Sequence, residues 1–151
     1  MTMGGQAGIG SWIRAYSLYW AWLVSAVATG GSLFLSEVLG YVPCKLCWFQ
    51  RICMYPLVIL LGRACLRSDR KIAGYVLPLS VLGGCISLYH YLEQKVPGFA
   101  GVLPCTAGVP CNRDYINWFG FVTIPFLALV AFILITVLMI VGGTRDEPAA
   151  D

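Results

Sequence analysis

Four long apolar stretches constrain the fold of this 151-residue chain more than any other feature of its sequence. They cover approximately residues 16–35, 48–66, 72–92 and 118–141. At about 1.5 Å of rise per helical residue, stretches of this length reach or approach the roughly 30 Å hydrocarbon core of a bilayer. The sequence therefore predicts an all-α membrane protein, a four-transmembrane-helix bundle that occupies residues 1–151 as a single integral membrane domain.

The composition supports this prediction and argues against a nucleic-acid partner. Hydrophobic residues make up 59% of the chain and charged residues 11%, with a mean hydropathy of +0.79, which is too apolar for a water-soluble domain of this length. The net charge of +3 is small, and the basic residues are scattered rather than clustered. We therefore expect the lipid bilayer, and no nucleic acid, among the partners.

The loops predict the orientation in the membrane. The end of the second stretch and its connection to the third hold four basic residues against the single Asp69, whereas the other two connections balance acidic and basic residues. By the positive-inside rule, this basic connection and both termini are cytoplasmic, and the other two connections lie outside. The four basic residues are Arg63, Arg67, Arg70 and Lys71.

The first stretch has an alternative interpretation as a cleaved signal peptide. Arg14 precedes the apolar run, and Ala26-Val27-Ala28 fits the small-x-small pattern of a cleavage site. The apolar run continues past this site to Leu35, which a full span requires and a signal peptide does not. We therefore favour a transmembrane span.

This topology sorts the seven cysteines into two groups. The two outer connections contain the close pairs Cys44/Cys47 and Cys105/Cys111, and such pairs form disulfides in an oxidising compartment. The other three cysteines lie within helices or at their inner ends, where cysteine behaves as a small apolar residue. These three are Cys53, Cys65 and Cys85.

Two other roles for the outer cysteines stay open. Structural disulfides across such short loops would each stabilise the fold by only about 2 kcal/mol, and helices confined by lipid gain little from them. A zinc site on four thiolates suits the Cys44/Cys47 spacing but not the five residues between Cys105 and Cys111. We therefore expect redox-active pairs and no metal site.

Cys47 and Arg51 combine a thiol and a cation on one helix face. Cys47 falls in the first turn of the second helix, where unpaired backbone N–H groups and the helix dipole favour the thiolate that exchanges disulfides. Arg51, four residues later, projects from the same face and would stabilise a thiolate or polarise the carbonyl of a hydrophobic electron acceptor. The alternative for Arg51 is an interfacial anchor that reaches back to the lipid headgroups.

His90, the only histidine, lies near the outer end of the third stretch, at the membrane level of the cysteines. A group that titrates near neutral pH could deliver a proton to a lipid-soluble quinone. The alternative is an interfacial polar residue between two tyrosines. We include His90, with Cys47 and Arg51, among the candidate cofactor-binding residues.

Two sequence blocks are far more specific than a bare Cys-x-x-Cys motif. The first is CKLCWFQR at residues 44–51, followed by MYPL at 54–57, and the second is PCNRDYINWFGF at 110–121, followed by TIP at 123–125. Both closely resemble the DsbB/BdbC family of disulfide bond formation proteins. The resemblance covers about residues 15–142 in the same order, and the short Cys105 to Cys111 spacing is similar to the BdbC branch.

The resemblance implies a quinone-dependent thiol oxidase in the bacterial cell membrane. Cys105/Cys111 would take electrons from a DsbA/BdbD-like thioredoxin-fold oxidase outside the membrane, with Cys105 forming the mixed disulfide. Cys44/Cys47 would receive these electrons and pass them to a membrane quinone, menaquinone or ubiquinone. The resemblance also implies that Cys47 lies next to the quinone and that Arg51 assists it.

Two rival functions differ in what they predict. Relatives of vitamin K epoxide reductase also combine several spans, two cysteine pairs and a quinone, but their loop pair precedes the Cys-x-x-Cys helix, whereas here Cys44/Cys47 comes first. A non-enzymatic membrane scaffold with structural disulfides or zinc would lose folding, rather than electron transfer, in the Cys47→Ser protein. The order of the pairs favours the DsbB/BdbC family.

Overall fold

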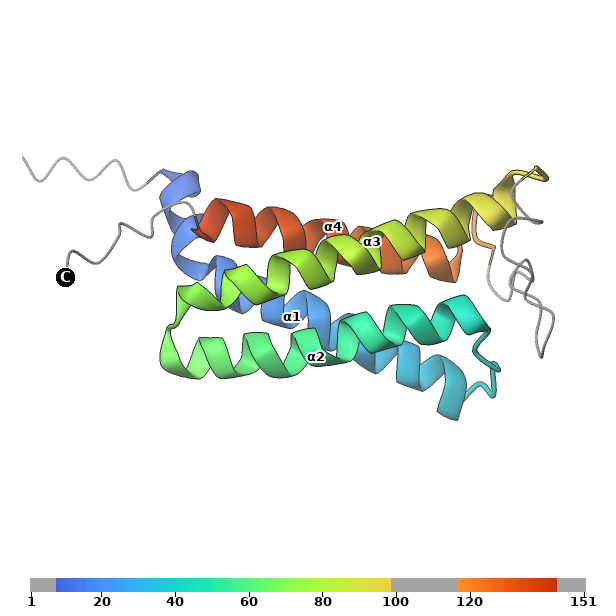
Figure 1. The fold of residues 1–151 in the computed structure, drawn as a ribbon, viewed down its shortest axis with the longest axis horizontal. Coiled ribbons are helices and arrows are strands. Elements are labelled where there is room, and N and C mark those ends of the chain that lie inside the picture. Colours follow the sequence, from blue (N-terminus) through green and yellow to red (C-terminus); the bar gives the residue numbers. More distant parts are fainter. Residues whose placement is uncertain (1–7, 99–116, 144–151) are drawn as a thin grey trace, which may run out of the picture.

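The computed structural model describes residues 8–98 and 117–143, and these residues form four long α-helices (Figure 1). They are α1 (Ile9–Glu37), α2 (Lys45–Arg67), α3 (Ala73–Lys95) and α4 (Ile124–Gly143), with a short 3-10 helix, η1 (Arg70–Ile72), before α3. All four α-helices are long and apolar enough to cross a bilayer. The predicted four-helix membrane bundle is therefore confirmed, and the protein is a multi-pass membrane protein.

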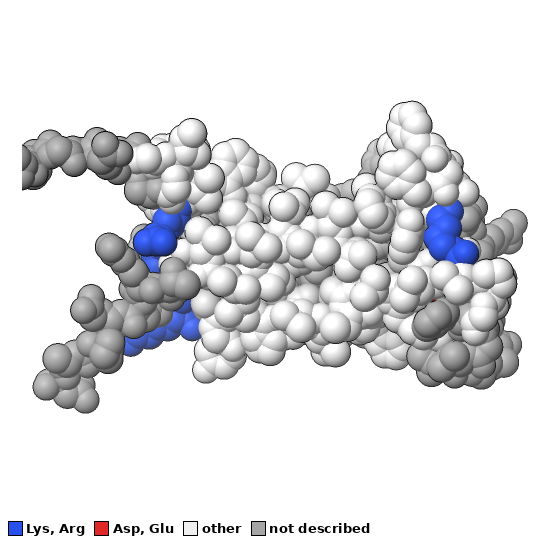
Figure 2. Space-filling model, turned by 90° about the horizontal axis from the view of Figure 1, so that it is seen from above, with Lys and Arg blue, Asp and Glu red and all other residues white. Residues whose placement is uncertain are grey.

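The helices form a closed bundle in which each packs against two neighbours, in the cyclic order α1, α2, α3, α4 (Figure 1). α1 begins and α4 ends at the same end of the bundle as the α2–α3 connection, whereas the α1–α2 connection lies at the opposite end. Figure 2 shows lysine and arginine near the two ends, separated by a long uncharged surface. This distribution suits a bundle whose middle lies in hydrocarbon.

Close packing between α3 and α4 depends on small and polar residues inside the bundle. The Phe132 ring of α4 is buried against Gly83 of α3, where a Cβ atom would collide with the ring. Nearby, the hydroxyls of Ser80 and Thr136 lie 2.9 Å apart and form a hydrogen bond between the two helices. Small residues and shared hydroxyl bonds are the usual means by which helices associate in lipid.

The fourth helix begins six residues later than the apolar pattern predicts, at Ile124 rather than at Trp118. Trp118 and Val122 instead pair through their backbones around a tight turn. This turn places Phe119 and Gly120 at φ values of 57° and 81°, which a right-handed helix does not allow. Hydrophobicity alone does not separate an apolar turn from the helix that follows it.

Candidate functional site

Cys44 and Cys47 lie together at the start of α2, at the end of the bundle opposite the α2–α3 connection. Cys44 is the N-cap residue of α2, and its sulfur accepts a hydrogen bond from the backbone N–H of Cys47 at 3.4 Å. The two Sγ atoms are 3.1 Å apart, and both cysteines are free thiols in this structure. The Cys-x-x-Cys spacing therefore produces a pair of sulfurs that can form a disulfide with little movement.

The contacts of the Cys44 sulfur favour a thiolate on this residue, which the sequence analysis did not single out. A hydrogen bond with the Cys47 thiol, together with the hydrogen bond and charge of His90, lowers the pKa of Cys44 from 9.0 to about 4, although burial opposes the shift. The backbone N–H of Cys47, which donates to the Cys44 sulfur at the helix cap, contributes a smaller part of the same shift. The structure therefore adds Cys44 as a candidate thiolate at the helix end where the sequence predicts one on Cys47.

His90 and Gln50 continue this cluster into the bundle. The His90 side chain is only 1% exposed, with Nε2 3.6 Å from the Cys44 sulfur and Nδ1 3.1 Å from Gln50 Nε2. When Nε2 carries a proton, it donates to the Cys44 sulfur, whereas the roles of Nδ1 and the Gln50 amide depend on the tautomer of the ring. His90 is therefore a buried partner of Cys44, and it is absent from the residues that line the pocket described below.

Sequence reasoning missed Gln50 and Glu93. Glu93, one turn after His90, is 5% exposed, and its Oε2 has no hydrogen-bond partner among the described residues. Both are polar residues in an apolar stretch, and each follows a predicted site residue by three positions. Gln50 follows Cys47 and Glu93 follows His90, a spacing that places each pair on one helix face. Only the packing of α2 against α3 shows that the two helices contribute to one cluster.

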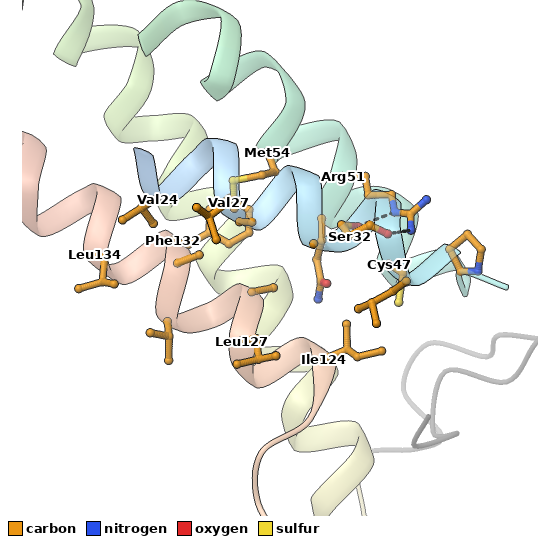
Figure 3. Close-up of a pocket in the computed structure, with 18 of the residues that line it drawn as sticks. Val24, Val27, Ser32, Cys47, Arg51, Met54, Ile124, Leu127, Phe132 and Leu134 are labelled. Carbon is orange, nitrogen blue, oxygen red and sulfur yellow. Dashed lines mark hydrogen bonds between the residues drawn. The ribbon is translucent and has the colours of Figure 1, made fainter. Parts of the chain in front are cut away.

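Arg51 reaches across to α1. Its Nε donates to the Ser32 hydroxyl and its Nη2 to the Ser32 carbonyl, both at 3.0 Å. The guanidinium also lies 5.7 Å from the centre of the Trp48 ring, within the range of a cation–π interaction. These contacts hold the guanidinium beside the pocket, one helical turn from Cys47 (Figure 3).

A cavity of about 570 Å³ lies between α1, α2 and α4 (Figure 3). Its walls are mostly aliphatic, with Val24 and Val27 from α1, Met54 from α2 and Leu127 from α4 among the labelled residues. Polar side chains on the wall nearest the start of α2 include Ser32, Tyr41, Cys47, Gln50 and Arg51. The structure thus places Cys47 and Arg51, which the sequence assigns to one helix face, on the lining of one pocket.

The structure describes three of the remaining five cysteines, and these three differ in burial and contacts. Cys105 and Cys111 lie outside the described residues. Cys53 is buried in the core, Cys65 donates from Sγ to the Leu18 carbonyl at 3.5 Å, and Cys85 is exposed on α3. The inner three therefore have no sulfur partner among the described residues.

Four membrane-spanning helices with a neighbouring dithiol beside an apolar pocket define a membrane protein of the thiol–disulfide oxidoreductase class. The family model described as disulfide bond formation protein DsbB matches residues 14–142. The chain therefore belongs to the DsbB family.

Individual relatives agree with this assignment. The chain is 55% identical over 135 residues to disulfide bond formation protein C of Bacillus subtilis, covering 89% of this chain and 98% of the relative. It is 54% identical over 124 residues to probable disulfide formation protein C 1 of Bacillus anthracis, covering 82% and 89%. A probable disulfide formation protein of Coxiella burnetii is 47% identical over 131 residues, covering 86% and 89%. No solved structure matches the chain.

Proposed function

We propose that this membrane disulfide oxidase is quinone-dependent and reoxidises an extracytoplasmic thioredoxin-fold oxidase of the DsbA/BdbD type. The observation that carries the proposal is that Cys47 and Arg51 share one wall of a large apolar cavity. A thiol–disulfide enzyme needs such a cavity only if its electrons leave toward an apolar small molecule. Membership of the DsbB family, whose relatives are disulfide formation proteins, supports the same activity.

The pocket residues fit a quinone, either menaquinone or ubiquinone. Aliphatic walls from α1 and α4 suit an isoprenoid tail, and the polar wall offers hydrogen-bond donors from Gln50 and Arg51 to a ring carbonyl. The Arg51 guanidinium is already oriented by Ser32, so little ordering is needed on binding. When bound, a quinone would supply the acceptor for two electrons and two protons.

The chain's own residues would perform the exchange chemistry. The Cys44 thiolate and the Cys47 thiol lie 3.1 Å apart and release two electrons when they form a disulfide. Cys105/Cys111 would first oxidise the partner, with Cys105 forming the mixed disulfide, and would then be reoxidised by Cys44/Cys47. This relay requires both pairs on the outer face, with both termini cytoplasmic, as the positive-inside rule predicts.

The test mixes the purified protein with a reduced thioredoxin-fold oxidase and a quinone. The measurement is the loss of thiols from the thioredoxin-fold partner. We expect oxidation to require the quinone and to be abolished in folded Cys47→Ser and Cys105→Ser proteins, because each loses one disulfide of the relay. Arg51→Gln should raise the KM for quinone about tenfold or more, since a charge-assisted hydrogen bond contributes about 1.5–3 kcal/mol.

Arg63→Gln is the matched control for Arg51→Gln, because it also removes one arginine from α2 but at the other end of the helix, where Arg63 is exposed. It should leave the KM unchanged. Oxidation that proceeds at the same rate without quinone, or that survives in the Cys47→Ser protein, would contradict the proposed function.

A further inference from the structure

Three potential metal ligands converge beside the start of α2, and neither the sequence nor the family match assigns them a metal. The Sγ atoms of Cys44 and Cys47 and a ring nitrogen of His90 all lie within 4.8 Å of one another. Cys44 and His90 are buried, and Cys47 is half-buried. The zinc site considered from the sequence required four thiolates, whereas this group takes its third ligand from α3.

We propose that Cys44, Cys47 and His90 form, in the reduced protein, a binding site for a thiophilic d¹⁰ dication such as zinc or cadmium. Two thiolates and one imidazole are a preferred ligand set for such ions, with a fourth position open to water. Two thiolates also neutralise the charge of the ion, which lowers the cost of placing it near the membrane interior.

The distances fit tetrahedral coordination. With zinc bonds of about 2.3 Å to sulfur and 2.0–2.1 Å to nitrogen, an ion would hold a sulfur and a nitrogen about 3.5 Å apart. The Cys44 sulfur lies 3.6 Å from His90 Nε2. The two sulfurs, now 3.1 Å apart, would separate to about 3.8 Å, which rotation of the half-buried Cys47 side chain can provide.

The surroundings of His90 resemble the outer contacts of a metal site. A histidine that binds metal through Nε2 carries its proton on Nδ1, and this N–H is normally held by a polar neighbour. The Gln50 amide nitrogen lies 3.1 Å from Nδ1, and after rotation of the amide its carbonyl oxygen can accept a hydrogen bond from the Nδ1–H group. The buried Glu93 carboxyl, one turn after His90, also interacts electrostatically with His90 and Cys44.

Binding involves no change of oxidation state. Each cysteine binds as a thiolate, so every sulfur that starts as a thiol releases one proton. A Cys44/Cys47 disulfide has no thiolate and would not bind the ion. The ion would therefore hold the pair reduced and stop the relay, a consequence that rests on the proposed function, whereas the binding itself does not.

Cadmium binding to the reduced full-length protein tests the site without quinone or partner. The readout is the sulfur-to-cadmium charge-transfer band in a protein whose other five cysteines are replaced by alanine. We expect one cadmium ion per chain, no band in the oxidised protein, and displacement by zinc. His90→Asn should weaken binding at least tenfold, and Gln50→Ala about tenfold, as for other outer contacts.

Several results would overturn the site. Unchanged affinity in a His90→Asn protein with an unaltered helical spectrum would show that the imidazole is not a ligand. A band in the oxidised protein would show adventitious binding. Loss of the band when only Cys105 and Cys111 are replaced would indicate a four-thiolate site instead. Because no activity is measured, each result is independent of whether the quinone relay operates.

Discussion

At the scale of single residues, the two cysteines of one motif differ because only one of them caps a helix. The Cys44 sulfur receives the Cys47 backbone N–H and lies against His90, whereas Cys47 faces the pocket with Arg51. Cys44 is therefore suited to hold negative charge in the reduced pair, and Cys47 to contact an acceptor in the pocket. The motif combines both properties within one helical turn.

The charge on Cys44 predicts an unusual pH dependence. Since its pKa in the folded protein is about 4 instead of 9.0, the thiolate stabilises the reduced protein fully above pH 9, and this stabilisation is lost as the pH falls through 4. The thiolate ultraviolet absorbance, taken as the difference from Cys44→Ser protein, should persist at neutral pH and disappear only near that lower value. In Cys47→Ala protein the titration should move upward, because the largest cause of the shift is gone. A titration near 9 in the unaltered protein would contradict the prediction.

At the scale of helices, α3 and α4 are held together by shape as well as by hydrogen bonds. Gly83 gives the Phe132 ring the space that any larger residue would fill, and the Ser80–Thr136 hydrogen bond lies on the same interface. His90 is on α3, so the fit between α3 and the rest of the bundle also determines its distance from Cys44.

Gly83→Ala and Gly84→Ala form a matched pair that tests this interface. A Cβ at position 83 would collide with the buried Phe132 ring, whereas one at position 84 would be in ordinary contact, 3.6 Å from Phe132 Cβ. Gly83→Ala should destabilise the protein by about 1–3 kcal/mol, as overpacking of a core does, while Gly84→Ala should cause no loss. Equilibrium denaturation in detergent measures both, and equal stabilities would show that the interface tolerates extra volume.

At the scale of the whole molecule, one end of the bundle is held by a basic residue of η1 that contacts both α1 and α4. Arg70 of η1 donates from Nη1 to the Gly142 carbonyl at 2.7 Å and from Nη2 to the Arg14 carbonyl at 3.2 Å. The start of α1, the end of α4 and the basic connection therefore lie at one end of the bundle. Cys44, Cys47 and His90 lie at the other end.

The orientation of the bundle can be tested by labelling single cysteines in a cysteine-free protein. Leu39 and Asp69 are both exposed, in the α1–α2 and α2–α3 connections respectively. In intact spheroplasts, a membrane-impermeant maleimide should react with Leu39→Cys protein but should react with Asp69→Cys protein only after permeabilisation. The opposite pattern would place the thiol pair in the cytoplasm and remove the basis for an extracytoplasmic partner.

The sequence by itself determined the number of spans, the class of fold and the conjunction of Cys47 with Arg51, because membrane insertion and helix periodicity depend on local composition and spacing. It misplaced the start of α4, because an apolar turn and an apolar helix have the same hydrophobicity. Only the tertiary structure brought His90 and Gln50, 40 residues apart in the chain, into contact. It also placed the Cys44 sulfur against His90 of another helix, a contact that favours a thiolate on Cys44. Both outcomes depend on how far apart the packed helices lie and on which sides of them are in contact. Residue spacing along a single helix determines neither.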